Sequence, residues 1–314
     1  MITTSAKEEI RQLLLSSGAI TAGFAEAGMV DQQALSQYEE WINEGMHAGM
    51  DYLERHAKLK QTPENVLEGT RTVISLAFSY ATGPARNPEL PMIACYALGE
   101  DYHDVLRKRL KPVLKELKEK FGGTWRICID SAPLAERYWA LKAGIGIKGR
   151  NGSVIVPGAG TLCFLVEVLT TLEIEADETV SEECEGCGAC LNACPTGALG
   201  ENGLIDARKC LSYLTIEHRG DWSEKEKKII ACYEKGIVLG CDICMKVCPH
   251  NRGIYPTAIK EFMPRREIME LTAEQINKMD EEKFKSIFQK NPMKRAGLQS
   301  LKRNVANCCI NVKK

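Results

Sequence analysis

Cysteine is the residue of this 314-residue chain whose number and spacing point most directly to chemistry. Nine of its fourteen cysteines fall in a window of 65 residues, and seven of these nine form two motifs. The first motif, C-x2-C-x2-C-x3-C-P, consists of Cys184, Cys187, Cys190 and Cys194. The second motif, C-x2-C-x3-C-P, consists of Cys241, Cys244 and Cys248. Cysteines clustered in this way in an intracellular chain indicate metal binding rather than disulfides.

The first motif has the spacing of bacterial ferredoxins, in which the fourth cysteine ligates the other of two clusters. Two [4Fe–4S] clusters require eight thiolates, whereas the motifs supply seven. The eighth must come from between the motifs, where Cys210 and Cys232 are the candidates. We expect one cluster on Cys184, Cys187, Cys190 and Cys248. We expect the other on Cys194, Cys241, Cys244 and either Cys210 or Cys232.

A structural zinc site is the alternative interpretation, because zinc sites also use paired C-x2-C motifs. Zinc motifs do not space three cysteines two residues apart and follow them with x3-Cys-Pro, so the pattern favours iron–sulfur clusters. The cysteines outside the window are Cys95, Cys128, Cys163, Cys308 and Cys309. We expect Cys128 and Cys163 to be small core residues and the last two to be inert.

The composition is that of an ordinary globular chain, with 44% hydrophobic and 26% charged residues. The net charge is −1, from 41 basic and 42 acidic residues, so an anionic partner must meet a local basic patch. The N-terminus lacks the apolar segment of a signal peptide. The apolar run from Thr161 to Leu172 is interrupted by Glu167 and is too short to span a bilayer. We expect a cytoplasmic protein that does not bind membranes.

Hydrophobic periodicity predicts the elements that must position these cysteines. The predicted strands are 73–80, 92–98 and 125–130, the predicted helices are 102–121 and 133–143, and residues 154–156 are predicted to form a hairpin with 162–169. This mixture indicates an α+β fold. We expect three units, which are residues 1–172, a ferredoxin-like unit at 173–260 and C-terminal helices at 261–314.

The long region before the cysteine window must serve a purpose beyond electron transfer. Two neighbouring clusters pass single electrons but perform no substrate chemistry by themselves, so the N-terminal unit should hold a redox cofactor or a substrate pocket. No strand–GxGxxG–helix motif is present, and a dinucleotide site of the Rossmann type is therefore not indicated. Composition and spacing do not identify the cofactor.

Several segments in order along the chain resemble epoxyqueuosine reductases, which are cobalamin-dependent iron–sulfur enzymes of tRNA queuosine synthesis. These segments are MDYLERH (50–56), RICIDSAPLAER (126–137), AGIGIKGRN (143–151), CEGCGACLNACPTGAL (184–199), KCLSYLTIEHRG (209–220), GCDICMKVCPHN (240–251) and RNVANCCIN (303–311). The resemblance covers nearly the whole chain, which makes it far more specific than either cysteine motif alone.

The resemblance implies an activity and a set of cofactors. It implies that the epoxide of epoxyqueuosine, at the wobble position of a tRNA with a GUN anticodon, is reduced to give queuosine and water. It implies a nitroreductase-like N-terminal domain that binds cobalamin without its lower base, two [4Fe–4S] clusters, and an external low-potential electron donor. It selects Cys210 as the eighth ligand and leaves Cys232 as a structural residue. We expect a monomer.

The resemblance also assigns Asp130 as the proton donor to the departing epoxide oxygen. A carboxylic acid donates a proton near neutral pH only if its pKa is raised, and burial against an apolar corrin face would raise it. The residues alone favour a different role, because Asp130 and Ser131 precede Pro133 at a helix start and are ordinary capping residues. The resemblance reverses that preference.

Other positions match the cobalamin site of the family less specifically, and they are Arg55, Cys95, Asp130, Val154, Ile155, Val156, Ser212 and Asp242. A surface ion pair is the ordinary alternative for Arg55, and a place in the core is the alternative for Cys95 and for residues 154–156. Contacts with tRNA phosphates are expected from Arg219, Lys294, Arg295, Lys302 and Arg303. The histidines show no metal-ligand spacing, and we expect most of them at the surface.

Two other functions fit part of the pattern. Reductive dehalogenases also combine cobalamin with two clusters, but they are usually exported with a twin-arginine signal, which the chain lacks. A pure electron-transfer protein would use its N-terminal unit only to dock partners, and it would not bind cobalamin. Many epoxyqueuosine reductases carry a further C-terminal helical-repeat domain, which would begin near Lys314. We therefore expect the C-terminal helices and the ferredoxin surface to make the tRNA contacts.

Overall fold

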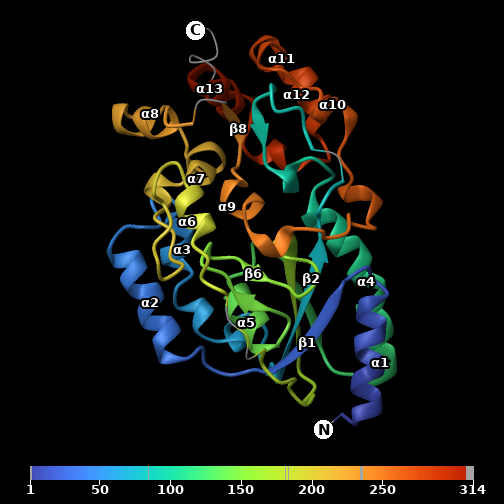
Figure 1. The fold of residues 1–314 in the computed structure, drawn as a ribbon. Coiled ribbons are helices and arrows are strands. Elements are labelled where there is room, and N and C mark those ends of the chain that lie inside the picture. The colour runs from blue at the N-terminus through green and yellow to red at the C-terminus, as the bar shows by residue number, and fades with distance from the viewer. Residues whose placement is uncertain (1, 84, 181, 183, 234–235, 309–314) are drawn as a thin grey trace.

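The computed structural model describes residues 2–308 apart from 84, 181, 183, 234 and 235, so Cys309 lies outside the described residues (Figure 1). The α-helices are α1 Thr4–Leu15, α2 Gln32–Asn43, α3 Asp51–Arg55, α4 Tyr102–Phe121, α5 Glu136–Lys142, α6 Ala189–Ala193, α7 Leu211–Ile216, α8 Glu224–Ile230, α9 Ile243–Lys246, α10 Arg266–Met269, α11 Ala273–Lys278, α12 Glu281–Phe288 and α13 Leu298–Cys308. The strands are β1 Thr21–Glu26, β2 Thr72–Ser79, β3 Met92–Ile93, β4 Trp125–Cys128, β5 Ile147–Lys148, β6 Val154–Ile155, β7 Cys163–Thr170 and β8 Ile237–Leu239. Helices and strands are mixed along the chain, as the sequence predicts.

A four-stranded sheet with the order β1-β2-β7-β4 is the centre of the N-terminal half, and all of its neighbouring strands are antiparallel. Every residue of β2 is buried, because helices cover both faces of the sheet (Figure 1). Alternate side chains of β2 therefore enter different cores. Ile74, Leu76 and Phe78 belong to the core under α1 and α4. Val73 and Ala77 belong to the core under α5.

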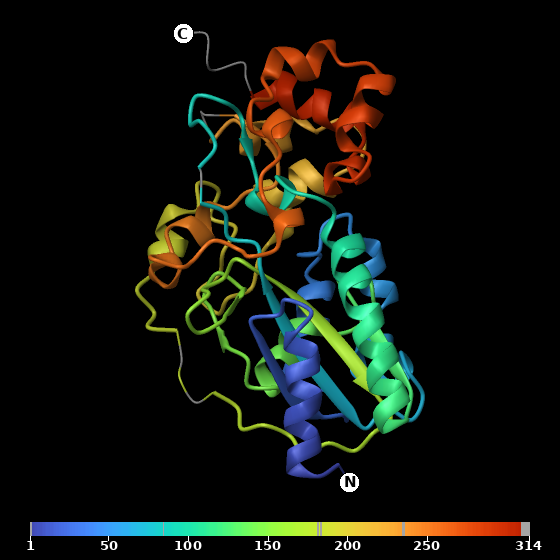
Figure 2. The same ribbon diagram turned by 90° about the vertical axis from the view of Figure 1, so that its right-hand side faces the viewer.

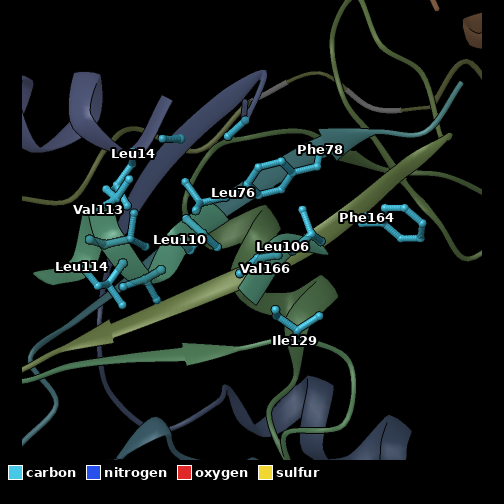
Figure 3. Close-up of a cluster of buried hydrophobic side chains, with 14 of the residues drawn as sticks. Leu14, Leu76, Phe78, Leu106, Leu110, Val113, Leu114, Ile129, Phe164 and Val166 are labelled. Carbon is cyan, nitrogen blue, oxygen red and sulfur yellow. The ribbon is translucent and has the colours of Figure 1, made fainter. Parts of the chain in front are cut away.

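The core under α1 and α4 rests on a long amphipathic helix (Figure 3). Apolar residues recur along α4 at intervals of three and four, so one face of the helix lies on the sheet. Its buried apolar residues are Val105, Leu106, Leu110, Val113, Leu114 and Leu117. The predicted bounds of this helix, 102–121, are confirmed. The first turn of α4 reaches the end of the sheet at which β4 leads into the loop carrying Asp130.

Close approach of α5 to the sheet depends on Gly23 in β1. A β carbon at this position would lie 2.0 Å from the carbonyl oxygen of Ala143 and 2.6 Å from Cγ2 of Ile145. No L side chain fits that space without moving the backbone that follows α5. Gly23 therefore sets the depth at which the end of α5 and the loop after it lie on the sheet.

Three of the predicted elements differ in the structure. The hairpin of 154–156 with 162–169 is wrong, because β6 pairs with β5 while β7 pairs with β2 and β4. Residues 92–98 form only the two-residue strand β3, which pairs with β8 and is followed by the 3₁₀ turn Cys95–Ala97. The strand 125–130 ends at Cys128, and Asp130 lies beyond it. In each case the extent of the strand depends on a partner that lies outside the predicted element, so the local pattern does not reveal it.

The C-terminal helices form a second core with segments from the middle of the chain. Ile93, Ala97 and Leu98 pack with Val238 and Leu239 and with the apolar faces of α10–α13. These helices lie at the end of the molecule opposite the N-terminus (Figure 2). This shared core thus connects the segment just before α4 to the C-terminal helices. None of the helices in the described part of the chain is long and apolar enough to span a bilayer.

Substituting Gly23 by Ala should destabilise the fold, because the added methyl group would overlap the Ala143 carbonyl. Overpacking of this kind costs about 1–3 kcal/mol. The midpoint of thermal unfolding should fall accordingly. The matched control is Gly28→Ala, because a β carbon at Gly28 meets no atom within 4 Å. Equal midpoints for the two variants would show that α5 can shift without cost.

Candidate cluster and active site

The structure brings together the four cysteines expected at the first cluster. Cys190 lies in α6, Cys184 and Cys187 lie in the loop before it, and Cys248 precedes the 3₁₀ turn Pro249–Asn251. The thiol of Cys248 is close enough to the other three for their charges to interact. All four line one hollow, together with Arg150 and His250 among other residues. The fourth cysteine of this group therefore comes from the second motif.

A second group of four thiols forms beside the first. Cys194 ends α6, Cys210 precedes α7, and Cys241 and Cys244 lie before and within α9. The Cys244 thiol interacts with those of Cys210 and Cys194, and the Cys241 thiol with those of Cys210 and Cys244. Cys232 is exposed, and its thiol donates instead to the Lys228 carbonyl oxygen at 3.3 Å. The geometry thus places Cys210 with this group and Cys232 apart from it.

The arrangement of these thiols fits two iron–sulfur clusters. Within the described residues, no three His, Cys, Asp or Glu side chains converge on a site for one metal ion. A [4Fe–4S] cube binds its ligands on four different irons and so holds four thiolates farther apart than one tetrahedral ion does. The loop can wrap the first group because Gly186 and Gly188 adopt left-handed conformations, with φ of 67° and 71°. A structural zinc site is therefore the poorer fit.

The protein environment favours the thiolate form at one ligand position in particular. Burial raises the pKa of the Cys241 and Cys244 thiols to about 12. Burial also acts on Cys194, but hydrogen bonds from Thr196 and from backbone N–H groups outweigh it and lower the pKa of that thiol. One of these donors is the N–H of Ala198, 3.4 Å from Sγ. Metal ligation requires thiolates, so these donors stabilise the ligating form.

Asp130 lies at the sheet edge in a conformation that few residues adopt. Its φ is +50°, in the left-handed region that Asp and Asn tolerate better than most residues. Its carboxylate oxygen Oδ2 accepts a hydrogen bond from the Tyr102 hydroxyl at 2.9 Å and lies 3.1 Å from Nε2 of His103. The residue at the N-cap of α5 is Ala135, which makes no side-chain capping bond. Asp130 therefore does not cap that helix.

The expected rise in the pKa of Asp130 depends on a bound corrin, and the protein groups alone act in the opposite direction. Burial acts to raise the pKa, but the hydrogen bonds from His103 and Tyr102 outweigh it and hold the pKa of Asp130 below its ordinary value. Solvent also reaches 60% of the side chain, which favours the ionised form. At neutral pH the Asp130 side chain is therefore a carboxylate that needs a proton before it can act as an acid.

One further carboxyl group, Glu136, contacts Asp130, and a second, Glu167, is close enough to Glu136 for their charges to interact. The Asp130 N–H donates to Oε1 of Glu136 at 2.5 Å, and burial followed by the Asp130 charge raises the pKa of Glu136 to about 7. Glu167 in β7 is fully buried, and within the described part of the chain neither of its carboxyl oxygens has a hydrogen-bond partner. Burial raises its pKa well above the ordinary range. Glu167 is therefore protonated at neutral pH.

The residues predicted to contact cobalamin are only partly brought together. The N–H of Cys95 donates to Oδ2 of Asp242 at 2.7 Å, which joins the turn after β3 to the loop of Cys241 and Cys244. Asp242 is only 1% exposed. Residues 154–156 are also buried, so only their main chain could contact a cofactor. Arg55 is exposed at the end of α3. Ser212 is half-buried, two residues after Cys210.

A large cofactor with an apolar face fits the surroundings of Asp130. Tyr52 and Leu59 are large side chains that remain 40% and 38% exposed. Tyr52 and Lys60, the neighbour of Leu59, both lie near enough to Asp130 for their charges to interact. Apolar surface left open beside a functional carboxylate is typical of a binding site.

The five cations predicted to bind tRNA have different surroundings. Lys294 and Arg295 form ion pairs with Asp101 at 3.3 and 2.9 Å. Arg303 donates to the carbonyl oxygens of His218, Gly220 and Leu214, and its guanidinium lies 4.7 Å from the Trp222 ring centroid. These contacts give it a structural role. Arg219 is exposed and Lys302 is half-buried. Binding of tRNA by these residues remains a prediction.

Sequence reasoning missed the residues around Asp130. We expected most histidines at the surface, and four of the five are half-buried, whereas the His103 side chain is only 5% exposed. Glu217, at the end of α7, is close enough to Asp130 and Arg295 for their charges to interact. The one local sequence signal for the contacts of His103 is Asp101, which lies two residues before it at the start of a long helix. A capping carboxylate so placed can also contact the histidine ring.

Comparison with known proteins agrees with these features. Residues 60–131 match the family model "Epoxyqueuosine reductase QueG, DUF1730", and residues 183–251 match a 4Fe-4S double cluster binding domain. An epoxyqueuosine reductase of Cyclobacterium marinum is 36% identical over 90% of each chain. That of Escherichia coli is 35% identical over 90% of this chain and 76% of the relative.

Solved structures of the same enzymes resemble the chain over nearly its whole length. A crystal structure of epoxyqueuosine reductase with an epoxyqueuosine-modified tRNA-Tyr stem loop has a TM-score of 0.87 at 26% identity, covering 98% of this chain and 81% of the other. A Bacillus subtilis epoxyqueuosine reductase, with its catalytic aspartate loop swung out of the active site, has a TM-score of 0.86 at 26% identity, covering 98% and 82%.

Anaerobic reconstitution with iron and sulfide should load about eight irons per chain, because two [4Fe–4S] clusters bind four each. The Cys210→Ala variant should lose about half of this iron, since its thiol lies with those of Cys241 and Cys244. The matched control is Cys232→Ala, whose thiol faces α8. Iron analysis and electron paramagnetic resonance of the reduced proteins provide the measurement. Loss of a cluster in the Cys232 variant alone would contradict the assignment.

Proposed function

The chain belongs to the epoxyqueuosine reductase family, and on this premise we propose that it reduces epoxyqueuosine to queuosine at the wobble position of a tRNA with a GUN anticodon. It is an oxidoreductase whose family uses cobalamin and two [4Fe–4S] clusters. The observation that carries the proposal is Asp130, a carboxylate held at the sheet edge near the helix that begins at the cluster ligand Cys210. This proposal replaces the two alternatives, a reductive dehalogenase and a pure electron-transfer protein.

The reaction requires two electrons and two protons for each epoxide. Both C–O bonds of the epoxide break, a carbon–carbon double bond forms between the two carbons, and the oxygen leaves as water. An external low-potential donor would supply the electrons, and the clusters, when bound to the eight thiols, would carry them singly. Cobalamin, when bound, supplies the low-potential cobalt that delivers electrons to the epoxide. The protein supplies position and protons.

The residues expected to hold these groups lie in three units. The eight thiols of the two groups, with Cys210 as the eighth, would bind the clusters within a ferredoxin-like unit at 173–260. A nitroreductase-like unit at 1–172 would bind base-off cobalamin, with Arg55, Cys95, Asp130, Val154, Ile155, Val156, Ser212 and Asp242 as its candidate contacts. The helices of 261–314 would complete the tRNA-binding face. We expect the protein to act as a monomer in the cytoplasm.

Within this scheme Asp130 protonates the departing oxygen. Its left-handed backbone turns the side chain toward the first turn of α4, where Tyr102 and His103 hold one carboxylate oxygen. The other oxygen, Oδ1, is left for the substrate. Stacking of the Tyr102 ring on Phe164, with centroids 4.2 Å apart and planes 10° apart, fixes the hydroxyl that orients the carboxylate.

Binding of tRNA should depend on Arg219 and Lys302 and should weaken as salt is added, because each neutralised phosphate releases counterions. Substituting either residue by Ala should lower the affinity and reduce the slope of log K against log salt by about one. Fluorescence anisotropy of a labelled anticodon stem loop measures both quantities. Lys115→Ala on α4, 79% exposed, is the control for a surface cation. Unchanged affinity in both variants would remove these residues from the interface.

Loaded enzyme should convert tRNA-bound epoxyqueuosine to queuosine, and Asp130→Asn should slow that conversion about 10²–10⁴-fold, the usual value of general acid catalysis. Asn tolerates the left-handed conformation, so the variant should fold and retain its cofactors. Single-turnover assays followed by mass spectrometry of the nucleoside measure the rate.

The control for this experiment is Asp31→Asn. Asp31 is a true N-cap, accepting the Ala34 N–H at 2.9 Å, and Asn caps a helix as well as Asp does. This variant should be as active as the parent chain. Near-normal rates for Asp130→Asn would exclude the acid role, and no queuosine from the fully loaded parent chain would overturn the proposed function itself.

A further inference from the structure

His103 connects Asp130 to a buried ion pair. Its Nε2 lies 3.1 Å from Oδ2 of Asp130, and its Nδ1 lies 3.0 Å from Oδ1 of Asp101. Asp101 in turn pairs with Arg295 at 2.9 Å and with Lys294 at 3.3 Å. The side chain of His103 is 5% exposed and that of Asp101 is 1% exposed, whereas Asp130 is open to solvent. The buried Asp101 and His103 thus lie between the partly exposed cations Arg295 and Lys294 and the open Asp130.

The start of α4 fixes this arrangement. Asp101 is the N-cap of the helix, and its Oδ1 accepts the backbone N–H of His103 at 3.1 Å as well as facing the ring. One carboxylate oxygen therefore holds both the main chain and the side chain of the same histidine. This leaves only Nε2 to face Asp130.

The groups around His103 come from several elements. Asp101 and Tyr102 belong to the start of α4, Asp130 to the loop after β4, and Arg295 to the 3₁₀ turn Pro292–Arg295. Glu217 from α7 interacts with Asp130 and Arg295, and Lys294 pairs with Asp101. Burial raises the pKa of Tyr102, so its hydroxyl keeps its proton and only orients Asp130. Among these groups, His103 is the one whose ordinary pKa lies near neutrality.

We propose that His103 is the positioning residue that reprotonates Asp130, passing a proton from its Nε2 to the Asp130 carboxylate for each epoxide oxygen released. This inference rests on the proposed function and adds the source of the proton.

This step supplies one of the two protons that convert the epoxide oxygen to water, and solvent supplies the other. The His103 imidazolium loses the Nε2 proton, Asp130 becomes a neutral carboxylic acid, and that acid protonates the departing oxygen and returns to carboxylate. His103 keeps its Nδ1 proton toward Asp101 and regains the Nε2 proton from water. No electron moves in these transfers, so the external donor and the clusters still supply both electrons.

The charges near His103 favour a ring that is charged at rest and can still release its proton. Burial opposes the charge, but the hydrogen bonds to Asp101 and Asp130 outweigh it and raise the pKa of His103 above 6.5. Arg295 acts in the opposite direction, because its Nη1 lies 2.7 Å from Nδ1 and 3.2 Å from Nε2. It can donate to Nε2 once the proton has left. At neutral pH the proton of the pair therefore rests on His103 rather than on Asp130.

The pH dependence of a single turnover tests this proposal. In the parent chain the rate should fall as the pH rises through the pKa of His103, because the protonated ring is the active form. Asp101→Asn removes a negative neighbour and should move this fall to lower pH. Arg295→Gln removes a positive neighbour and should move it to higher pH. A structural role alone would lower the rate in both variants without shifts of opposite sign.

His103→Gln is the decisive variant, because Gln keeps a donor toward Asp130 but carries no titrating proton. The fall with pH should disappear, and the rate at the optimum should drop about 10²-fold, with unchanged iron content, cobalamin spectrum and KM for tRNA. An unchanged pH profile in this variant, or a parent profile that is flat from pH 6 to 9, would overturn the proposal.

A second measurement does not depend on activity. Histidine-selective ¹³C labelling of the full loaded chain gives five resonances to titrate, and the one absent from His103→Gln reports that ring. Its pKa should lie above 6.5 and fall in Asp101→Asn. A pKa below 6.5 would overturn the relay even if queuosine is formed. A raised pKa without queuosine formation by the parent chain would instead count against the proposed function.

Discussion

The buried carboxylate of Asp101 is the constraint on which the arrangement of the active site depends. A charge that is 1% exposed is costly unless it is paired and hydrogen-bonded. Burial acts to raise its pKa, but contacts with His103 and the charge of Arg295 lower the pKa of Asp101 to about 2. The stability that this carboxylate contributes is therefore present above about pH 4 and is lost as the pH falls toward 2. At neutral pH the ion pair is intact.

The segment around Asp101 also joins two distant parts of the chain. The Asp101 N–H donates to the Lys290 carbonyl oxygen at 2.7 Å, and Asn291 donates to the carbonyl oxygens of Ala97 and Gly99 at 2.7 and 2.6 Å. These bonds hold the 3₁₀ turn of Arg295 against the first turn of α4. The C-terminal helices therefore contribute to the geometry of the acid site and do not only enlarge the surface. This explains why residues 92–98 share a core with α10–α13.

The sequence predicts features that depend on local patterns and misses those that depend on distant partners. Cysteine spacing and the ligand count predicted seven of the eight thiols and left Cys210 and Cys232 open for the eighth, which the family resemblance assigned to Cys210. Apolar periodicity predicted the bounds of α4. The hairpin of β6 with β7 failed because strand pairing is set by which strands the helices bring together. The ion pair of Arg295 could not be predicted either, because its partner Asp101 lies 194 residues away in sequence. Local composition contains no signal for such a pair.

One short helix, α7, links the second thiol group to the surroundings of Asp130. Helix α7 begins after Cys210, whose thiol belongs to the second group, and ends at Glu217, which interacts with Asp130 and Arg295. Six helical residues rise about 9 Å, so a cluster held by Cys210 lies within a few turns of helix of the acid. The proposed proton source, His103, contacts Asp130 from a different element, the first turn of α4. A reaction that consumes both electrons and protons gains from this arrangement, because the reducing centre and the acid are held by separate elements that meet only at the substrate. Either supply can then be altered by substitution without displacing the other.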